Sequence, residues 1–262
     1  MTPDSRPLAV VTGASTGIGY ELARICAVNG FDLVIAADEP AISEAASRLA
    51  TPGIGIEPVE TDLATADGVD ALVAATAGRP VAALLANAGR GLGHAFVDQD
   101  WNEIRRVIDT NVTGTTCLVH RIAPGMVRQG EGRILLTGSI AGFMPGAYQA
   151  VYNATKSYID SFALALREEL RGSGVTVTCL MPGPTDTEFF ARGGLEDTKL
   201  AQVATADPAG VARQGFDAMM KGSGDVVTGW SNKLQAALAE ITPAGLTTRL
   251  HGKLAEPGSA KD

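Results

Sequence analysis

Residues 12–19 spell T-G-A-S-T-G-I-G, between a short apolar run, Leu8–Thr12, and a helix-like stretch, Ile18–Asn29. Glycines in this segment permit a tight turn and a close approach of the backbone to a ligand. The start of the next helix offers unpaired N–H groups and a partial positive charge, which suit a phosphate. The candidate contacts are Gly13, Ser15, Thr16, Gly17, Ile18 and Gly19. The spacing is G-x-x-x-G-x-G, so the turn alone is also compatible with an ordinary strand-to-helix connection.

Around this turn, apolar runs of strand length alternate with amphipathic stretches of helix length. The expected strands are Leu8–Thr12, Phe31–Ala37, Gly55–Val59, Ala82–Ala86, Arg133–Thr137, Val175–Met181 and Asp225–Thr228. The expected helices are Ile18–Asn29, Ala41–Ala50, Ala66–Ala77, Trp101–Arg128, Tyr152–Arg171 and Pro208–Lys221, followed by Lys233–Leu254 with an interruption at Pro243. Because the strands are almost continuously apolar, both faces of the sheet are expected to be covered. The sequence predicts an α/β fold with a Rossmann-type, doubly wound parallel sheet and helices on both faces.

The length of 262 residues, with 45% hydrophobic side chains, suits one domain spanning 1–262. After Pro182 the alternation breaks, and residues 184–206 are expected to form a lid over a site. The small, polar end at 255–262 is expected to be frayed.

Charge and composition exclude several classes of protein. A net charge of −8 argues against nucleic acid and anionic lipid as partners. No stretch approaches a membrane span, and the N-terminus lacks the apolar core of a secretory signal, so we expect a cytoplasmic protein. Cys26, Cys117 and Cys179 are far apart, without C-x-x-C spacing, and the three histidines form no ligand pair. We therefore expect neither a metal site nor a disulfide.

Asp38 ends the second expected strand, nineteen residues after Gly19. A carboxylate there can accept hydrogen bonds from ribose hydroxyls and would repel a 2′-phosphate. The two places where a cation could meet that phosphate hold Thr16 and Glu39. Charge complementarity therefore favours NAD over NADP. The alternative for Asp38 is a solvated strand end or a helix cap.

Tyr152 and Lys156 are four residues apart at the start of a helix, so they project from one face. An ammonium beside a phenol is expected to lower the phenol pKa, which would suit proton transfer near neutral pH. Such pairs are also common on protein surfaces. Ser139, just beyond the fifth strand, can orient a substrate oxygen beside the phenol. Asn111, a poor helix former within a long helix, either has a functional role or bonds neighbouring backbone.

Together these motifs resemble the short-chain dehydrogenase/reductase family over roughly Leu8 to Phe190. The motifs are T-G-A-S-T-G-I-G at 12–19, Asp62, N-A-G at 87–89, Asn111, Ser139, Y-N-A-T-K at 152–156 and P-G-P-T-D-T at 182–187. The resemblance implies that Tyr152 exchanges a proton with the substrate oxygen while hydride passes between substrate and nicotinamide. It also implies that Lys156 holds the nicotinamide ribose, Ser139 orients the substrate oxygen, and Asn111 holds a water.

Further cofactor contacts are expected at the carboxyl ends of strands, which line the crevice of an open parallel sheet. By resemblance, Asp62 and Leu63 contact the adenine, and the backbone of Asn87, Ala88 and Gly89 lies near the adenosine ribose. Pro182, Gly183, Thr185 and Thr187 belong to the segment expected beside the nicotinamide, and Tyr152 and Lys156 complete the cofactor set.

We predict an NAD(H)-dependent oxidoreductase that interconverts a secondary alcohol and a ketone. A partly apolar substrate pocket is expected from Phe143, Met144, Phe189 and Phe190. Two alternatives are a catalytically silent NAD-sensing or interaction protein on the same fold, and a reductase of an activated carbon–carbon double bond. By resemblance we also expect a homodimer or homotetramer built through the helices 101–128 and 152–171.

Overall fold

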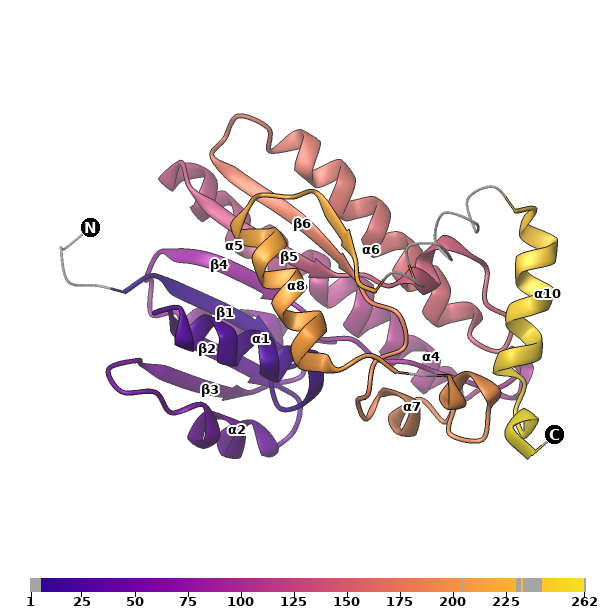
Figure 1. Ribbon diagram of the computed structural model, residues 1–262. Coiled ribbons are helices and arrows are strands. Elements are labelled where there is room, and N and C mark those ends of the chain that lie inside the picture. The colour runs from indigo at the N-terminus through magenta and orange to yellow at the C-terminus, as the bar shows by residue number, and fades with distance from the viewer. Residues whose placement is uncertain (1–5, 204, 230–231, 233–241, 262) are drawn as a thin grey trace.

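A computed structural model describes residues 6–203, 205–229, 232 and 242–261. Seven parallel strands form one sheet in the order β3-β2-β1-β4-β5-β6-β7 (Figure 1). They are β1 Leu8–Thr12, β2 Asp32–Ala37, β3 Ile56–Glu60, β4 Val81–Ala86, β5 Gly132–Thr137, β6 Val175–Met181 and β7 Asp225–Val227. From β1 the chain builds toward β3 on one side and, from β4 on, toward β7 on the other. This reversal opens a crevice at the carboxyl ends of β1 and β4. The predicted Rossmann-type doubly wound sheet is confirmed.

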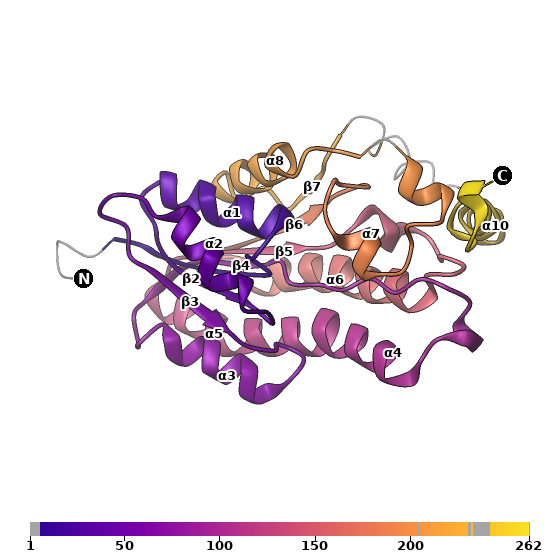
Figure 2. The ribbon, with the colours of Figure 1, turned by 90° about the horizontal axis from the view of Figure 1, so that it is seen from below.

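Helices cover both faces of the sheet (Figure 2). One face carries α1 Gly17–Val28, α2 Ala41–Leu49 and α8 Pro208–Met220. The other carries α3 Ala66–Ala75, α4 Trp101–Ile108, α5 Thr115–Gln129 and α6 Ala150–Glu169. Within the described part of the chain, no helix combines the length and apolar character needed to cross a membrane.

Alternation of side chains along the strands produces two cores, one on each face. In β1, Leu8 and Val10 pack with residues of α3, α5 and α6, whereas Ala9 and Val11 pack with residues of α1, α2 and α8. All four side chains are almost fully buried. Successive residues of a strand point to opposite faces, so a strand buried on both sides must be apolar throughout. The continuous apolar runs of the sequence reflect this geometry.

The long helix expected over residues 101–128 is interrupted. A π-helical stretch, Asp109–Gly114, separates α4 from α5. A side chain on Gly114 would collide with the backbone oxygen of Leu63, because its Cβ would lie 2.0 Å from that atom. Such wide turns are typical of functional positions. Here the wide turn contains Asn111.

Residues 184–206 form a loop whose two ends pair with each other. Asp186 N donates to Ala206 O at 2.9 Å, and Ala206 N donates to Pro184 O at 2.9 Å. Between these ends lie α7, Phe189–Arg192, and a short 3₁₀ turn, Lys199–Gln202. Ala204 lies outside the described residues. We call residues 184–206 the covering loop.

The C-terminal segment contacts the covering loop. Helix α10, Ala244–Ala255, begins directly after Pro243, and Ala255 is fully buried. Beyond it, Ala260 N donates to Asp197 O at 2.9 Å, and Ser259 Oγ accepts from Lys199 N at 3.0 Å. These two hydrogen bonds hold the end of the chain against the covering loop. The expected helical stretch from Lys233 lies, over positions 233–241, outside the described residues.

Candidate active site

One cavity of about 770 Å³ lies at the carboxyl ends of the strands. Ser139, Tyr152, Lys156 and every expected cofactor contact line it. Those contacts are Gly13, Ser15, Thr16, Gly17, Ile18, Gly19, Asp38, Asp62, Leu63, Asn87, Ala88, Gly89, Pro182, Gly183, Thr185 and Thr187, besides Tyr152 and Lys156. Of the expected catalytic residues, Asn111 alone does not line this cavity.

The turn after β1 leaves room for a ligand backbone to approach. Gly13 and Gly17 adopt φ values of +64° and +57°, which glycine tolerates and other residues rarely adopt. A Cβ on Gly19 would lie 2.0 Å from Gly13 O. The residue that precedes α1, Thr16, caps no N–H of this helix through its side chain. The start of α1 therefore presents free donors to an anionic group, and the turn fits the pyrophosphate of a dinucleotide.

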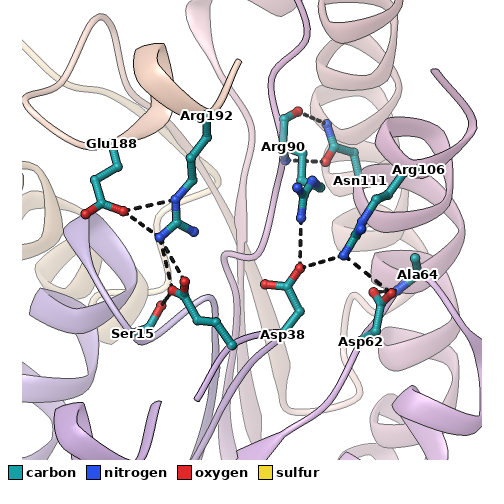
Figure 3. A network of polar contacts seen from close by, with 10 residues as sticks. Ser15, Asp38, Asp62, Ala64, Arg90, Arg106, Asn111, Glu188 and Arg192 are labelled. Atoms are coloured by element: carbon teal, nitrogen blue, oxygen red, sulfur yellow. Dashed lines mark hydrogen bonds and ion pairs between the residues drawn. The ribbon is translucent and has the colours of Figure 1, made fainter. Parts of the chain in front are cut away.

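Asp38, at the end of β2, is held by two arginines (Figure 3). Arg90 Nη1 lies 2.8 Å from Asp38 Oδ2, and Arg106 Nη2 lies 3.1 Å from the same oxygen. Arg106 also lies 3.7 Å from Asp62 Oδ2. The chain neighbours of Asp38 and Gly17 at these positions, Glu39 and Thr16, carry no positive charge. The fold brings guanidinium groups from the segment after β4 and from α4 to this carboxylate, which partly compensates its charge.

Glu39 joins the turn after β1 to the covering loop. Its carboxylate accepts from Ser15 Oγ at 2.5 Å and from Arg192 Nη2 at 3.1 Å. Arg192, in α7, also bonds Glu188 one turn earlier (Figure 3). Close packing reinforces this junction, because a Cβ on Gly17 would lie 2.9 Å from Thr187 Cγ2. The covering loop therefore lies over the turn at Gly13–Gly19.

Asn111 is buried behind the cavity and supports its wall. Its amide accepts from Arg90 N at 2.8 Å and donates to Arg90 O at 2.9 Å. Its remaining N–H donates to Thr155 Oγ1 at 3.0 Å. Both amide donors are used, so the side chain fixes the segment after β4 and ties it to α6. The expected link from Asn111 through a water remains a prediction.

Tyr152, Lys156 and Asp160 occupy one face of α6, at successive turns. Tyr152 is 8% exposed and Lys156 is 6% exposed. Lys156 Nζ donates to Thr137 O at 2.8 Å and lies 5.9 Å from the centre of the Tyr152 ring. Burial lowers the pKa of Lys156, and the Asp160 carboxyl opposes this.

The Tyr152 pKa differs from the expectation. Burial raises the pKa of this phenol to about 12, a hydrogen bond with Ser139 opposes the rise, and the nearby Asp160 adds to it. The expected net lowering is wrong, because the desolvation of the buried phenolate dominates the pKa. Tyr152 is therefore protonated near neutral pH, the form in which it can donate a proton to a substrate oxygen.

Ser139 follows β5 and faces the cavity beside Tyr152. Its Oγ accepts from Ala141 N at 3.1 Å and donates to Pro182 O at 3.4 Å. The backbone N–H of Ser139 donates to Asp160 Oδ1 at 3.3 Å. These contacts fix the hydroxyl group at the junction between β5, α6 and the segment after β6.

Asp160 lies behind the site, where it accepts from Ser139 N, and it was not among the expected residues. Burial raises the pKa of its carboxyl to about 6, although Lys156 opposes the rise. Side chains on Gly138 and Gly142 would collide with it, since their Cβ atoms would lie 1.8 Å and 2.0 Å from its two oxygens. The sequence offers one signal for Asp160: it is four residues after Lys156 and therefore lies on the same helix face. Its burial against two glycines is visible only in the fold.

Three of the four expected pocket residues line the cavity. Phe189 packs on Tyr152, with ring centres 5.0 Å apart, and a Cβ on Gly91 would lie 2.5 Å from the Phe189 ring. Met144 and Phe190 also line the cavity. Phe143 instead packs against the core between the sheet and α6, so its expected place in the pocket is wrong.

Comparisons with known proteins agree with this geometry. The family model of short chain dehydrogenases matches residues 7–196. An uncharacterized oxidoreductase of Myxococcus xanthus is 32% identical over 240 residues, which cover 90% of this chain and 92% of that protein. A short-chain dehydrogenase from Sphingobium yanoikuyae, solved in complex with NADPH, has a TM-score of 0.80 at 27% identity and covers 91% of this chain and 97% of its own. One from Burkholderia phymatum, solved in complex with NAD, has a TM-score of 0.79 at 26% identity, with coverage of 91% and 94%.

This chain therefore belongs to the short-chain dehydrogenase/reductase family and is an oxidoreductase of that family. The resemblance drawn from the sequence motifs is confirmed.

Proposed function

We propose that this protein is an NAD(H)-dependent oxidoreductase that interconverts a secondary alcohol and a ketone. One observation carries the proposal: buried Ser139 and Tyr152 share a cavity with the glycine-rich turn and with Lys156. The hydroxyl groups of Ser139 and Tyr152 suit a substrate oxygen, and the glycine-rich turn suits a dinucleotide pyrophosphate. Both are needed when a hydride and a proton must move within one enclosed space.

A bound nicotinamide supplies or accepts the hydride. The residues of this chain handle the proton and the oxygen. In the reducing direction Tyr152 donates its phenolic proton to the carbonyl oxygen, and in the oxidising direction the phenolate accepts the proton of the alcohol. Ser139 holds the same oxygen by a hydrogen bond. Lys156 would hold the nicotinamide ribose and supply positive charge near Tyr152, which favours the phenolate when it forms.

The test is turnover with a panel of ketones and alcohols of graded size, followed by NADH absorbance. Tyr152→Phe should lower kcat at least about a hundredfold, because general acid–base catalysis contributes at least that much, while NADH binding stays close to the wild-type value. Tyr158→Phe, on the exposed side of the same helix, serves as the matched control. Full activity of Tyr152→Phe would refute the proton-transfer role. Binding of NADH without turnover of any panel member would favour the silent alternative.

NAD is proposed as the cofactor because two carboxylates, Asp38 and Glu39, follow β2 where the adenosine ribose is expected. Both arginines bonded to Asp38 use Oδ2, so Oδ1 can accept a ribose hydroxyl. Asp38→Ala should weaken NADH binding and shift the ratio of the kcat/KM values for NADH and NADPH toward NADPH. The control is Asp217→Ala, an exposed aspartate on α8. An unchanged ratio would show that Asp38 does not select between NADH and NADPH.

Self-association through the helices 101–128 and 152–171 is also proposed. Trp101 on α4 is 64% exposed and Leu164 on α6 is 49% exposed, which suits an apolar contact between copies. Light scattering measures the oligomeric state directly, and a monomer at micromolar concentration would contradict the proposal.

A further inference from the structure

Two polar side chains, Gln149 and His251, line the substrate side of the cavity among apolar neighbours that include Met144, Phe190 and Leu254. They come from distant parts of the chain: Gln149 immediately precedes α6, and His251 lies in α10. An apolar pocket needs few polar groups to select its ligand, and those it has usually set the orientation. The hydrogen-bonding state of these two side chains therefore indicates what the substrate must carry.

His251 presents a hydrogen-bond acceptor. Its Nδ1 lies 3.1 Å from Ala147 O, and a carbonyl oxygen can only accept, so Nδ1 carries the proton. Burial lowers the pKa of the ring, and the bond to Ala147 opposes this only in part. A lowered pKa favours the neutral ring, in which Nε2 carries a lone pair that can accept a hydrogen bond. No described residue bonds Nε2, and it is not sealed from solvent.

Gln149 adds an amide side chain to the same part of the cavity. The residue is 2% exposed, and within the described ranges its side chain has no hydrogen-bond partner. Gln149 lines the cavity, and among the described residues neither of its amide atoms is a buried atom without a partner. Its backbone is fixed, because Gln149 N donates to Gly146 O at 3.1 Å and Asn153 N donates to Gln149 O at 2.9 Å. Gln149 stands three residues before Tyr152 in the chain.

The fold holds His251 against this loop. A Cβ on Gly252 would lie 3.3 Å from Ala147 Cβ, so α10 and the loop are in close contact. Tyr148 Oη donates to Glu256 Oε1 at 3.4 Å. Tyr148 itself has a φ of +63°, a conformation that costs free energy in a non-glycine residue. The strained residue lies between Ala147, which fixes His251, and Gln149.

We propose that the substrate carries a second hydroxyl group, separate from the oxygen that Tyr152 handles, and that His251 Nε2 accepts a hydrogen bond from it. The amide of Gln149 hydrogen-bonds the same group or its neighbour. The substrate class is then a hydroxyketone, or the corresponding diol, with an apolar remainder against the covering loop. This inference rests on the proposed alcohol–ketone activity, and it names the substrate class of that site.

The experiment uses the full chain with NADH and sets of three ketones on one carbon skeleton. Each set has a hydroxyl at one stated position, a methoxy group there, or neither. The wild type should prefer the hydroxyketone by about tenfold in kcat/KM at one position at least, since a neutral hydrogen bond contributes on that order. The methoxyketone keeps the oxygen but has no proton to donate, so it should behave like the unsubstituted ketone.

His251→Phe keeps a ring and removes the acceptor, so the hydroxyl preference should fall about tenfold. His120→Phe, the same change on the exposed side of α5, is the matched control. Gln149→Met should reduce the preference less. His251→Gln, which keeps an accepting oxygen, should retain part of it and serves if His251→Phe does not fold. NADH fluorescence and thermal melting report on cofactor binding and folding in each variant.

Turnover without any hydroxyl preference would overturn the inference while leaving the proposed function intact. A preference that persists in His251→Phe, or one shared equally by the methoxyketones, would also overturn it. Absence of turnover with every ketone would overturn the proposed function itself, so the two failures are distinguishable.

Discussion

Replacement of Asp160 by asparagine removes an ionisable group from the buried side of the site and keeps its shape. In the structure Asp160 Oδ1 accepts from Ser139 N and from Cys179 Sγ, at 3.3 Å and 3.5 Å. Asp160 Oδ2 has no partner in the described part of the chain. Burial raises the pKa of the carboxyl from an ordinary 3.8 to about 6, against the opposing effect of Lys156. Ionisation of this group therefore costs the folded state free energy.

The sign and size of the effect follow from linkage. Because the folded pKa is the higher one, this group stabilises the fold below about pH 4, and that stability is lost as pH rises through 6. The difference between 3.8 and about 6 corresponds to about 3 kcal/mol in total. Between pH 5.0 and 7.5 the loss is about 1.4 kcal/mol. The asparagine side chain of the variant cannot ionise, so Asp160→Asn should lack this part of the pH dependence.

Urea unfolding at a series of pH values between 5.0 and 7.5 measures the free energy of unfolding directly. The difference between wild type and Asp160→Asn should change by about 1.4 kcal/mol over this range, in favour of the variant at the higher pH. Asp217→Asn on the exposed side of α8 is the control and should follow the wild type. If Asp160→Asn and wild type show parallel pH profiles, the carboxyl does not titrate as the buried geometry requires.

Two further predictions concern the turn after β1 and the covering loop. Gly19→Ala should weaken NADH binding at least about fivefold, because overpacking costs about 1–3 kcal/mol and the new Cβ would lie 2.0 Å from Gly13 O. NADH fluorescence titration measures this change. Gly245→Ala, where a Cβ meets no atom within 4 Å, is the control, and equal affinities would refute the steric argument. Arg192→Met removes the ion pair with Glu39 and should speed NADH release by up to about fivefold, since a partly exposed pair contributes at most about 1 kcal/mol. Stopped-flow fluorescence measures that rate, and an unchanged or slower release in the variant would show that the pair does not hold the covering loop over the turn.

Much of the site could be predicted from the chain because its residues follow strand ends. In a parallel sheet all carboxyl ends lie on one edge, so Asp38, Asn87 and Ser139 had to meet once their strands were recognised. Tyr152 and Lys156 share a helix face through spacing alone. The features missed depend on other contacts: Arg90 and Arg106 reach Asp38 only because β2 and β4 flank β1.

The pKa of Tyr152 likewise depends on tertiary contacts and not on spacing along the chain. A pair of residues one helical turn apart predicts that an ammonium lowers the pKa of a neighbouring phenol. Burial of Tyr152 by the covering loop and the sheet, together with Asp160, outweighs that effect and raises the pKa to about 12. Desolvation depends on everything that surrounds a side chain, so spacing along one helix cannot supply it.

The turn at residues 12–19 and the alternation of apolar runs determined, by themselves, the sheet, the edge on which the site lies and the family. These are local properties, because strand burial and helix periodicity are written in successive residues. Tertiary structure alone decided that the end of the chain packs on the covering loop, that Arg192 meets Glu39, and that His251 enters the cavity. Each of these brings together segments that are far apart in the chain and whose docking depends on shape complementarity, and no local pattern encodes such a contact.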